Sequence, residues 1–118
     1  MTTIELFRKE TDFKAVPAGA TIFTTGDPGE EMYVVLEGEV DLKLRGRTVE
    51  TVGPGGIFGE LALIDNSPRT ATAIARTACN LAPVSQKRFL YMVQQTPHFS
   101  LQIMKVIAER LRTMDERF

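Results

Sequence analysis

The sequence is poor in the residues that most often carry catalysis or bind metal ions. Its 118 residues include one histidine, His98, and one cysteine, Cys79. A metal centre usually needs several His, Cys or carboxylate ligands, and a nucleophilic triad needs a histidine beside its nucleophile. We therefore expect no catalytic residue and no metal site; His98 is interpreted as a surface or capping residue and Cys79 as core. A single cysteine also excludes an internal disulfide and is typical of a reducing compartment.

An excess of charge of one sign and long apolar runs are missing as well. Fourteen Lys and Arg residues face fifteen Asp and Glu residues, for a net charge of −1. Such a balance gives no electrostatic argument for binding DNA or a membrane surface. No segment approaches the ~20 apolar residues of a membrane-spanning helix, and residues 1–5 lack the layout of a signal peptide. We expect a cytoplasmic protein with no membrane partner and no direct DNA binding.

The length and the composition indicate one folded domain. Apolar residues make up 43% of the chain and charged residues 25%, as in ordinary globular proteins. A chain of 118 residues can bury one core but not two. The whole chain, residues 1–118, is therefore predicted to be a single domain.

Short β-prone runs separated by turn signals occupy most of the first 84 residues. The turn signals are clusters of glycine and proline, such as Gly26-Asp27-Pro28-Gly29 and Gly53-Pro54-Gly55-Gly56. Regular spacing of short strands is typical of a sandwich or barrel. We predict an antiparallel β-roll, similar to a jelly-roll barrel, over about residues 12–84. Its strands are expected at residues 13–16, 21–24, 32–36, 40–44, 48–52, 70–75 and 78–84.

Helical periodicity appears at the two ends of the chain. A short amphipathic helix is predicted over residues 4–9. From Ser85, a suitable N-cap, apolar residues fall at helical spacing through Gln95, and Thr96-Pro97 breaks this helix. A second helix is predicted from Phe99 to near the end, so that the helices span about residues 85–116. The fold class is α+β.

The last predicted helix has two apolar stripes. One stripe suits a two-helix seam and comprises Leu101, Met104, Ala108, Leu111 and Phe118. The other comprises Ile103, Ile107 and Met114, with Arg110 among them. Two apolar stripes predict that two surfaces pack against this helix: the domain's own β-roll and a copy of the same helix in a homodimer. The alternative is a single broad stripe that faces the core.

The stretch from Phe58 to Thr72, FGELALIDNSPRTAT, has the residues of an anion site. Residues 60–64 suit one capped helical turn, whose N-terminal N–H groups and dipole attract anions, and Gly59 permits close approach of a ligand. Arg69 offers a planar charged fork that matches phosphate oxygens. Glu60 can accept hydrogen bonds from a sugar hydroxyl. Together these residues indicate a small phosphorylated ribose as the ligand.

This stretch resembles the phosphate-binding cassette of the cyclic nucleotide-binding domain family, which occurs in bacterial catabolite-activator-type regulators, kinase regulatory subunits and cyclic nucleotide-gated channels. The resemblance lies in the order Gly-Glu-Leu-Ala-Leu, a four-residue spacer and Pro-Arg-x-Ala, and in the upstream run from Gly26 to Val40. It covers about residues 7–112. It implies that the ligand is cAMP or cGMP and that no other cofactor is needed; the bacterial character of the chain favours cAMP.

The resemblance assigns a role to each residue of the site. Arg69 pairs with the cyclic phosphate and Glu60 binds the ribose 2′-hydroxyl. Backbone groups come from Gly59, Leu61, Ala62 and Ala71, and Val49, Leu61 and Ala73 are either pocket walls or ordinary core.

Two further positions leave alternatives open. The Thr70 hydroxyl can contact the phosphate with either base, so it does not decide between cAMP and cGMP. Arg110 corresponds to an arginine that reaches the glutamate and the ribose in some family members; the alternative is a helix arginine that extends to solvent.

The resemblance implies a non-catalytic sensor whose C-terminal helix changes position when the ligand binds. Its expected partners are the cyclic nucleotide, a second copy bound through the C-terminal helix, and an unknown effector protein. No DNA-reading helix-turn-helix follows Phe118, and Met1-Thr2-Thr3 looks like a natural start, which favours a stand-alone protein over a fragment. The alternatives are a dimerisation or interaction module of the same fold without ligand, and a cupin-like enzyme, which the single histidine disfavours.

Overall fold

The computed structural model describes residues 13–117, and the side chains up to Arg112. The helix predicted over residues 4–9 lies outside the described residues. The chain forms two compact units, one that extends to Gln86 and one that starts at Lys87.

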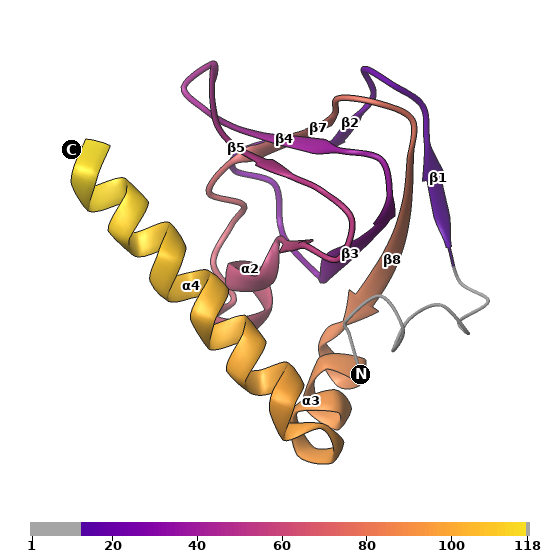
Figure 1. The fold of residues 1–118 in the computed structure, drawn as a ribbon, viewed down its shortest axis with the longest axis vertical. Helices are drawn as coiled ribbons and strands as arrows, with labels where there is room; N and C mark the ends of the chain where they lie inside the picture. The colour runs from indigo at the N-terminus through magenta and orange to yellow at the C-terminus, as the bar shows by residue number, and fades with distance from the viewer. Residues whose placement is uncertain (1–12, 118) are drawn as a thin grey trace. The chain divides into compact units, whose positions relative to one another are not determined.

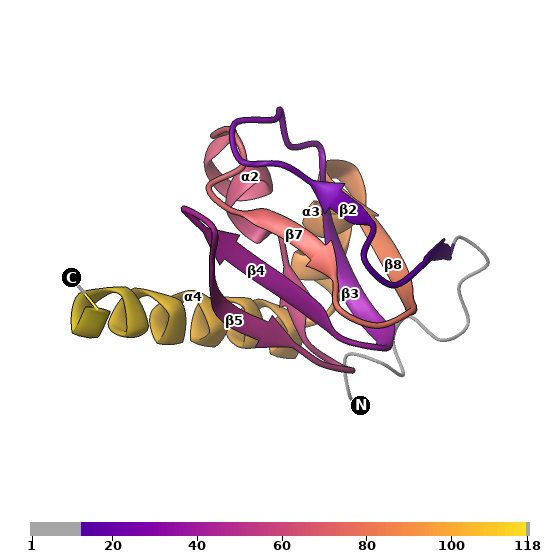
Figure 2. The same ribbon diagram turned by 90° about the horizontal axis from the view of Figure 1, so that it is seen from above.

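The first unit is an antiparallel β-roll of two four-stranded sheets (Figure 1). One sheet has the order β1-β8-β3-β6 and the other the order β2-β7-β4-β5, whose strands lie side by side in Figure 2. The strands are β1 (Lys14–Val16), β2 (Thr21–Phe23), β3 (Glu31–Glu37), β4 (Val40–Leu44), β5 (Arg47–Val52), β6 (Ile57–Phe58), β7 (Thr72–Ala75) and β8 (Cys79–Ser85). The predicted roll and its antiparallel pairing are confirmed. The two sheets do not close into a barrel, because no strand of one sheet pairs with a strand of the other within residues 13–117.

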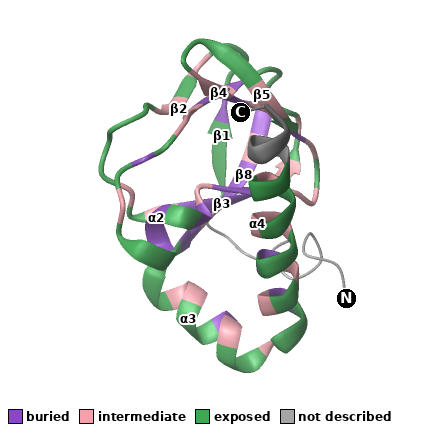
Figure 3. Cartoon of the chain, turned by 90° about the vertical axis from the view of Figure 1, so that its left-hand side faces the viewer, coloured by how far each residue is buried: buried purple, intermediate pink, exposed green. Residues whose placement is uncertain are grey.

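The core lies between the two sheets. Its cluster includes Val35, Val40, Phe58 and Leu81, of which none exposes any surface. Four consecutive residues of β3, Met32 to Val35, are buried, so both faces of this strand are covered (Figure 3). A strand buried on both faces has a continuous apolar sequence, which explains the uninterrupted run. Cys79 is also buried, as predicted.

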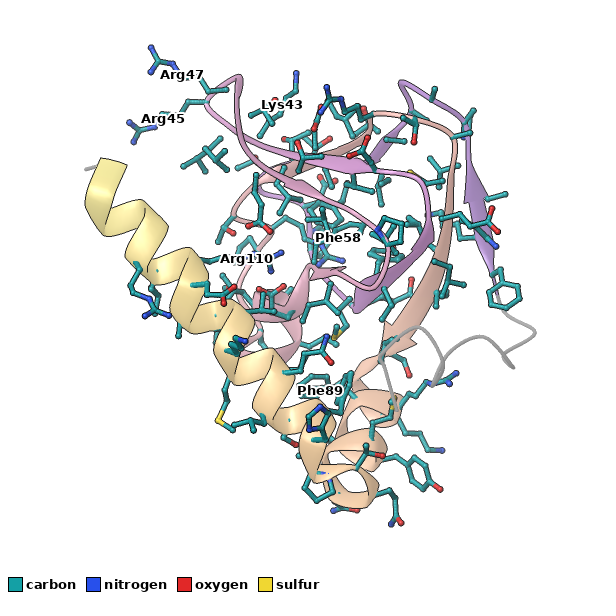
Figure 4. The ribbon with its side chains drawn as sticks, in the orientation of Figure 1. Lys43, Arg45, Arg47, Phe58, Phe89 and Arg110 are labelled. Atoms are coloured by element: carbon teal, nitrogen blue, oxygen red, sulfur yellow. The ribbon has the colours of Figure 1, made fainter. Side chains whose placement is uncertain are left out.

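A two-residue turn joins β4 to β5. Arg45 and Gly46 have φ angles of 54° and 79°, as a type I′ hairpin turn requires. Lys43, Arg45 and Arg47 extend outward at this end of the roll (Figure 4). The tight connection predicted at residues 45–47 is confirmed, although β5 begins one residue earlier than predicted, at Arg47. Strand β6 was not predicted, because two residues are too few for a period to show.

The second unit consists of helices α3 (Gln86–Gln95) and α4 (Pro97–Arg117). The predicted break at residues 96–97 is confirmed, but α4 begins at Pro97 and not at Phe99, since proline suits the first helical position. The rings of Phe89 and Phe99 meet edge to face, with 6.0 Å between centroids. His98 is exposed, as predicted. None of the helices in the described part of the chain is long and apolar enough to cross a membrane.

The two stripes of α4 differ in exposure. Ile103 is buried and Ile107 is half-buried, whereas Leu101, Met104 and Leu111 are exposed. Phe118 and the side chain of Met114 lie outside the described residues. The prediction of two distinct faces is therefore confirmed for the described members.

Candidate functional site

The site is built around helix α2 (Glu60–Asp65), which follows β6 directly. Gly59 precedes this helix with φ 80°, and no side chain caps the helix. A Cβ atom at residue 59 would lie 2.7 Å from Nη1 of Arg69, so only glycine fits. The predicted helical turn is confirmed. The group that closely approaches Gly59 in this structure is the guanidinium of Arg69.

Arg69 is buried, with 6% of its surface exposed, although it lies in a loop. Its backbone N–H donates to the carbonyl oxygen of Asp27, and its carbonyl oxygen accepts from the N–H of Gly26, both at 2.8 Å. These two bonds fasten the loop of Arg69 to the β2–β3 connection. Its Nη1 donates to the carbonyl oxygen of Gly59 at 3.0 Å, and its Nη2 donates to that of Glu31 at 2.6 Å. The two side-chain hydrogen bonds therefore fix the position of the guanidinium within the first unit.

One nitrogen of this guanidinium is buried without a partner. The Nε atom of Arg69 forms no hydrogen bond with the residues that the structure describes. A buried donor that lacks an acceptor costs about 1–3 kcal/mol. Burial lowers the pKa of Arg69 from its ordinary value, and nearby acidic groups, first Tyr33 and then Glu31, partly offset this. The group remains a cation, and an anion is the partner that would satisfy both its charge and its free donor.

Glu60 contributes a buried carboxylate at the start of α2. Only 2% of its surface is exposed, and its charge contributes to the electrostatic environment of Arg69. The site thus combines a buried cation, in the loop that follows α2, with a buried hydrogen-bond acceptor in the first turn of α2. The α2 helix has only six residues, so the dipole effect predicted for its N-terminus is small beside the full charge of Arg69.

The other predicted residues of the cassette lie on or beside α2. Ala62 is buried and Leu61 is exposed, while Thr70 is exposed and Ala71 half-buried. The strand predicted from Thr70 begins at Thr72 instead, because Arg69 pairs with the β2–β3 connection and keeps the next two residues in the loop.

The three residues predicted as pocket walls or ordinary core differ in how far they are exposed. Ala73 is buried and Val49 is half-buried, but Leu61 is exposed and is therefore not ordinary core.

Arg110 lies in the second unit, on α4, and is half-buried (Figure 4). Arg110 belongs to a different unit from Glu60 and Arg69. Its role in the site therefore stays a prediction.

Sequence reasoning missed the residues that hold Arg69. Glu31 and Asp27 contribute carbonyl oxygens, and Phe23 places its ring under the guanidinium, with Cζ of Arg69 4.0 Å from the ring centroid. A Cβ atom at Gly29 would collide with the Cβ of Ala62 and lie 3.0 Å from Cζ of Arg69. The available signal is the run from Gly26 to Val40, which resembles the family but by itself assigns none of its residues a contact with Arg69. Carbonyl acceptors leave no sequence signal, because every residue has one.

Comparisons with known proteins show to which family this chain belongs. The model of the family described as cyclic nucleotide-binding domain matches residues 13–96. The chain is similar to the cAMP-dependent protein kinase regulatory subunit of Eremothecium gossypii, with 47% identity over 76 residues, which cover 64% of this chain and 17% of that protein. It is also similar to the CRP-like cAMP-activated global transcriptional regulator of Mycobacterium tuberculosis, with 33% identity over 101 residues, which cover 81% of this chain and 45% of that protein.

A solved structure extends the likeness to the fold. The catabolite activator protein of Thermus thermophilus matches with a TM-score of 0.82 and 31% identity, over 98% of this chain and 56% of that chain. This chain spans less than half the length of the two curated relatives named above.

Proposed function

Since this chain belongs to the cyclic nucleotide-binding domain family, we propose that it is a non-catalytic sensor that binds a cyclic nucleotide, cAMP in preference to cGMP. The observation that carries this proposal is the buried Arg69 guanidinium with its unpartnered Nε. A cation kept in the interior needs a compensating anion or a strong structural reason. The cyclic phosphate is that anion.

The hydrogen-bond capacity of Arg69 supports a phosphate ligand. A guanidinium has five N–H donors, and each terminal nitrogen of Arg69 has one bond to a carbonyl oxygen. The N–H of Nε and one further N–H on each terminal nitrogen remain for the ligand. Planar forks of this kind pair with two oxygens of one phosphate.

The remaining cassette residues would bind the rest of the nucleotide. Glu60 accepts from the ribose 2′-hydroxyl, and its burial strengthens such a bond because little water competes. The proposed ligand-binding residues are Gly59, Glu60, Leu61, Ala62, Arg69, Thr70, Ala71 and Arg110.

The preference for cAMP rests on the relatives. The kinase subunit and the transcriptional regulator both carry cAMP in their names. Thr70 is exposed and its hydroxyl is compatible with either base. Titrations with cAMP and with cGMP therefore have to measure the preference between adenine and guanine.

The output of the sensor would be a change in the position of α4. A ligand shifts such an equilibrium only by its difference in affinity for the two arrangements. The exposed stripe of Leu101, Met104 and Leu111 would bind a second copy of α4 in a homodimer, and an effector protein would read the change. The same stripe supports the second candidate function, a dimerisation module that binds no ligand.

Calorimetric titration of refolded, nucleotide-free protein with cAMP and then with cGMP separates the two candidates. We expect binding at micromolar concentration or tighter, with cAMP the tighter ligand. 5′-AMP is the matched control, because it has the same base and sugar but an open phosphate monoester. A folded protein that gives no heat with either cyclic nucleotide would exclude the sensor and leave the dimerisation module.

A further inference from the structure

We propose that Phe23 is a positioning residue whose ring holds the guanidinium of Arg69 in the plane that the phosphate requires. This inference rests on the proposed function, because it concerns the same ligand. Phe23 ends strand β2, far from the cassette in sequence. It contributes no hydrogen-bonding group to the ligand, so its role would be to act through Arg69.

The guanidinium occupies a slot with defined walls. Two of its edges donate to the carbonyl oxygens of Gly59 and Glu31, at 3.0 and 2.6 Å. The ring of Phe23 covers it at 4.0 Å from Cζ to the centroid, well within the ~6 Å range of cation–π attraction. A Cβ atom at Gly29 would lie 3.0 Å from both Cζ and Nε, so the absence of a side chain there leaves the slot open.

The ring of Phe23 is itself fixed by the core. Its centroid lies 5.9 Å from that of Phe58 and 6.3 Å from that of Tyr33, and these two rings stack on each other at 5.3 Å. Phe58 is fully buried in the interior of the roll (Figure 4). The pairing register of β2 with β7 shifts between Thr21 and Phe23, and such irregularities redirect side chains. Phe23 therefore cannot turn away from Arg69 without unpacking this aromatic cluster.

An aromatic face suits this position better than a carboxylate would. The attraction between a cation and the face of a ring uses no N–H donor, whereas a carboxylate accepts hydrogen bonds from the N–H donors of the guanidinium. Phe23 thus stabilises the buried charge and leaves the N–H of Nε unused. The contact with Phe23 uses none of the N–H donors of Arg69, so those that the carbonyl oxygens leave unused remain available to an anionic ligand.

The experiment replaces Phe23 in the full chain with pentafluorophenylalanine, leucine and tyrosine. Fluorination keeps the shape of the ring but removes the negative charge of its face. We expect pentafluorophenylalanine and leucine to weaken cAMP binding about three- to thirtyfold, and tyrosine, which keeps the face, to retain affinity within about twofold. The fluorinated variant should still fold, with the thermal midpoint of its nucleotide-free form lower by several degrees, because the attraction that stabilises the buried charge is lost.

Phe89 is the matched control for fluorination. It is also half-buried, but among the described side chains its ring contacts that of Phe99 and not a cation. Pentafluorophenylalanine at residue 89 should leave the affinity unchanged. If the wild type binds neither nucleotide, the proposed function fails and this role fails with it. If the wild type binds cAMP and the variant fluorinated at residue 23 binds equally well, only the role of Phe23 is overturned, whether or not the leucine variant folds.

Discussion

At the scale of single residues, Arg69 decides what the site can bind. It is a buried cation whose hydrogen bonds in this structure go to neutral carbonyl oxygens. Nearby acidic groups, among them Glu31 and Glu60, offset part of the cost of burying this charge, and the buried Nε keeps a donor for an anion that arrives with the ligand. Geometry and charge both matter here, and they can be tested separately.

The substitution Arg69→Lys keeps the charge and removes the fork. We expect cAMP affinity to fall by about 2–5 kcal/mol, because an ammonium group cannot donate to both carbonyl oxygens and present two parallel bonds to the phosphate. Calorimetry measures the loss. Arg47→Lys, at an exposed position of the β4–β5 hairpin, is the control and should bind normally. Unchanged affinity in Arg69→Lys would remove Arg69 from the site.

Glu60 makes a different prediction, about the sugar. Wild-type protein should bind 2′-deoxy-cAMP more weakly than cAMP by about 1.5–3 kcal/mol, the range for a hydrogen bond to a charged group. The variant Glu60→Gln should bind cAMP less tightly and discriminate less between the two ligands. Equal affinity of the wild type for both ligands would show that the carboxylate does not bind the 2′-hydroxyl.

Cys79 gives a test of the core that does not depend on the ligand. Burial raises the pKa of its thiol above the usual 9.0, and the carbonyl oxygens of Glu39 and Thr77, each 3.2 Å from Sγ, share its single S–H donor. A raised pKa leaves less thiolate at a given pH, and the stability that it contributes is lost as pH rises from the unfolded value through the folded one. We expect iodoacetamide to alkylate Cys79 far more slowly in native than in denatured protein at pH 8. Equal rates would contradict the buried position.

At the scale of elements, α4 carries a row of exposed apolar side chains along one face. Leu101, Met104 and Leu111 each expose more than half of their surface, at 60%, 59% and 58%. Their positions follow the spacing of a two-helix seam. The α3–α4 contact explains the buried ring of Phe99 but leaves this stripe uncovered within its own unit.

Leu111→Lys tests whether a second copy covers the stripe. We expect the dimer dissociation constant to rise about tenfold or more, because burial of a leucine contributes about 1.5–3 kcal/mol. Sedimentation velocity over a range of concentrations measures it. Leu90→Lys, at an exposed leucine of α3, is the control and should not change the dimer. A wild-type protein that remains monomeric at all concentrations would contradict the dimer.

At the scale of the whole molecule, ligand binding and stability are linked. A ligand that binds only the folded protein stabilises it by about 2.7 kcal/mol at a concentration of one hundred times Kd. For a chain of this size we expect the thermal midpoint to rise by about 10 °C under those conditions. Differential scanning calorimetry at several cAMP concentrations measures the rise. The variant Arg69→Lys at the same concentrations should show a much smaller one, and a midpoint independent of cAMP in the wild type would contradict ligand binding.

The β-roll, the two C-terminal helices and the core of the cassette could be predicted from the amino-acid sequence. These features depend on local patterns: turn residues between short β-prone runs, helical spacing after Ser85, and the order of residues from Gly59 to Ala71. Local patterns predict local structure because propensity, capping and turn chemistry act over a few residues. For the same reason they did not show β6, which is two residues long.

The contacts that hold Arg69 could not be predicted from the sequence and became visible in the folded chain. Its partners Phe23, Asp27 and Glu31 lie about forty residues earlier in the chain, on β2, the following turn and β3. Two of them act through carbonyl oxygens, which every residue has, and the third acts through a ring that reads as ordinary core. Sheet pairing brings them to the arginine, and pairing between distant strands depends on the packing of the whole roll, which no local pattern encodes.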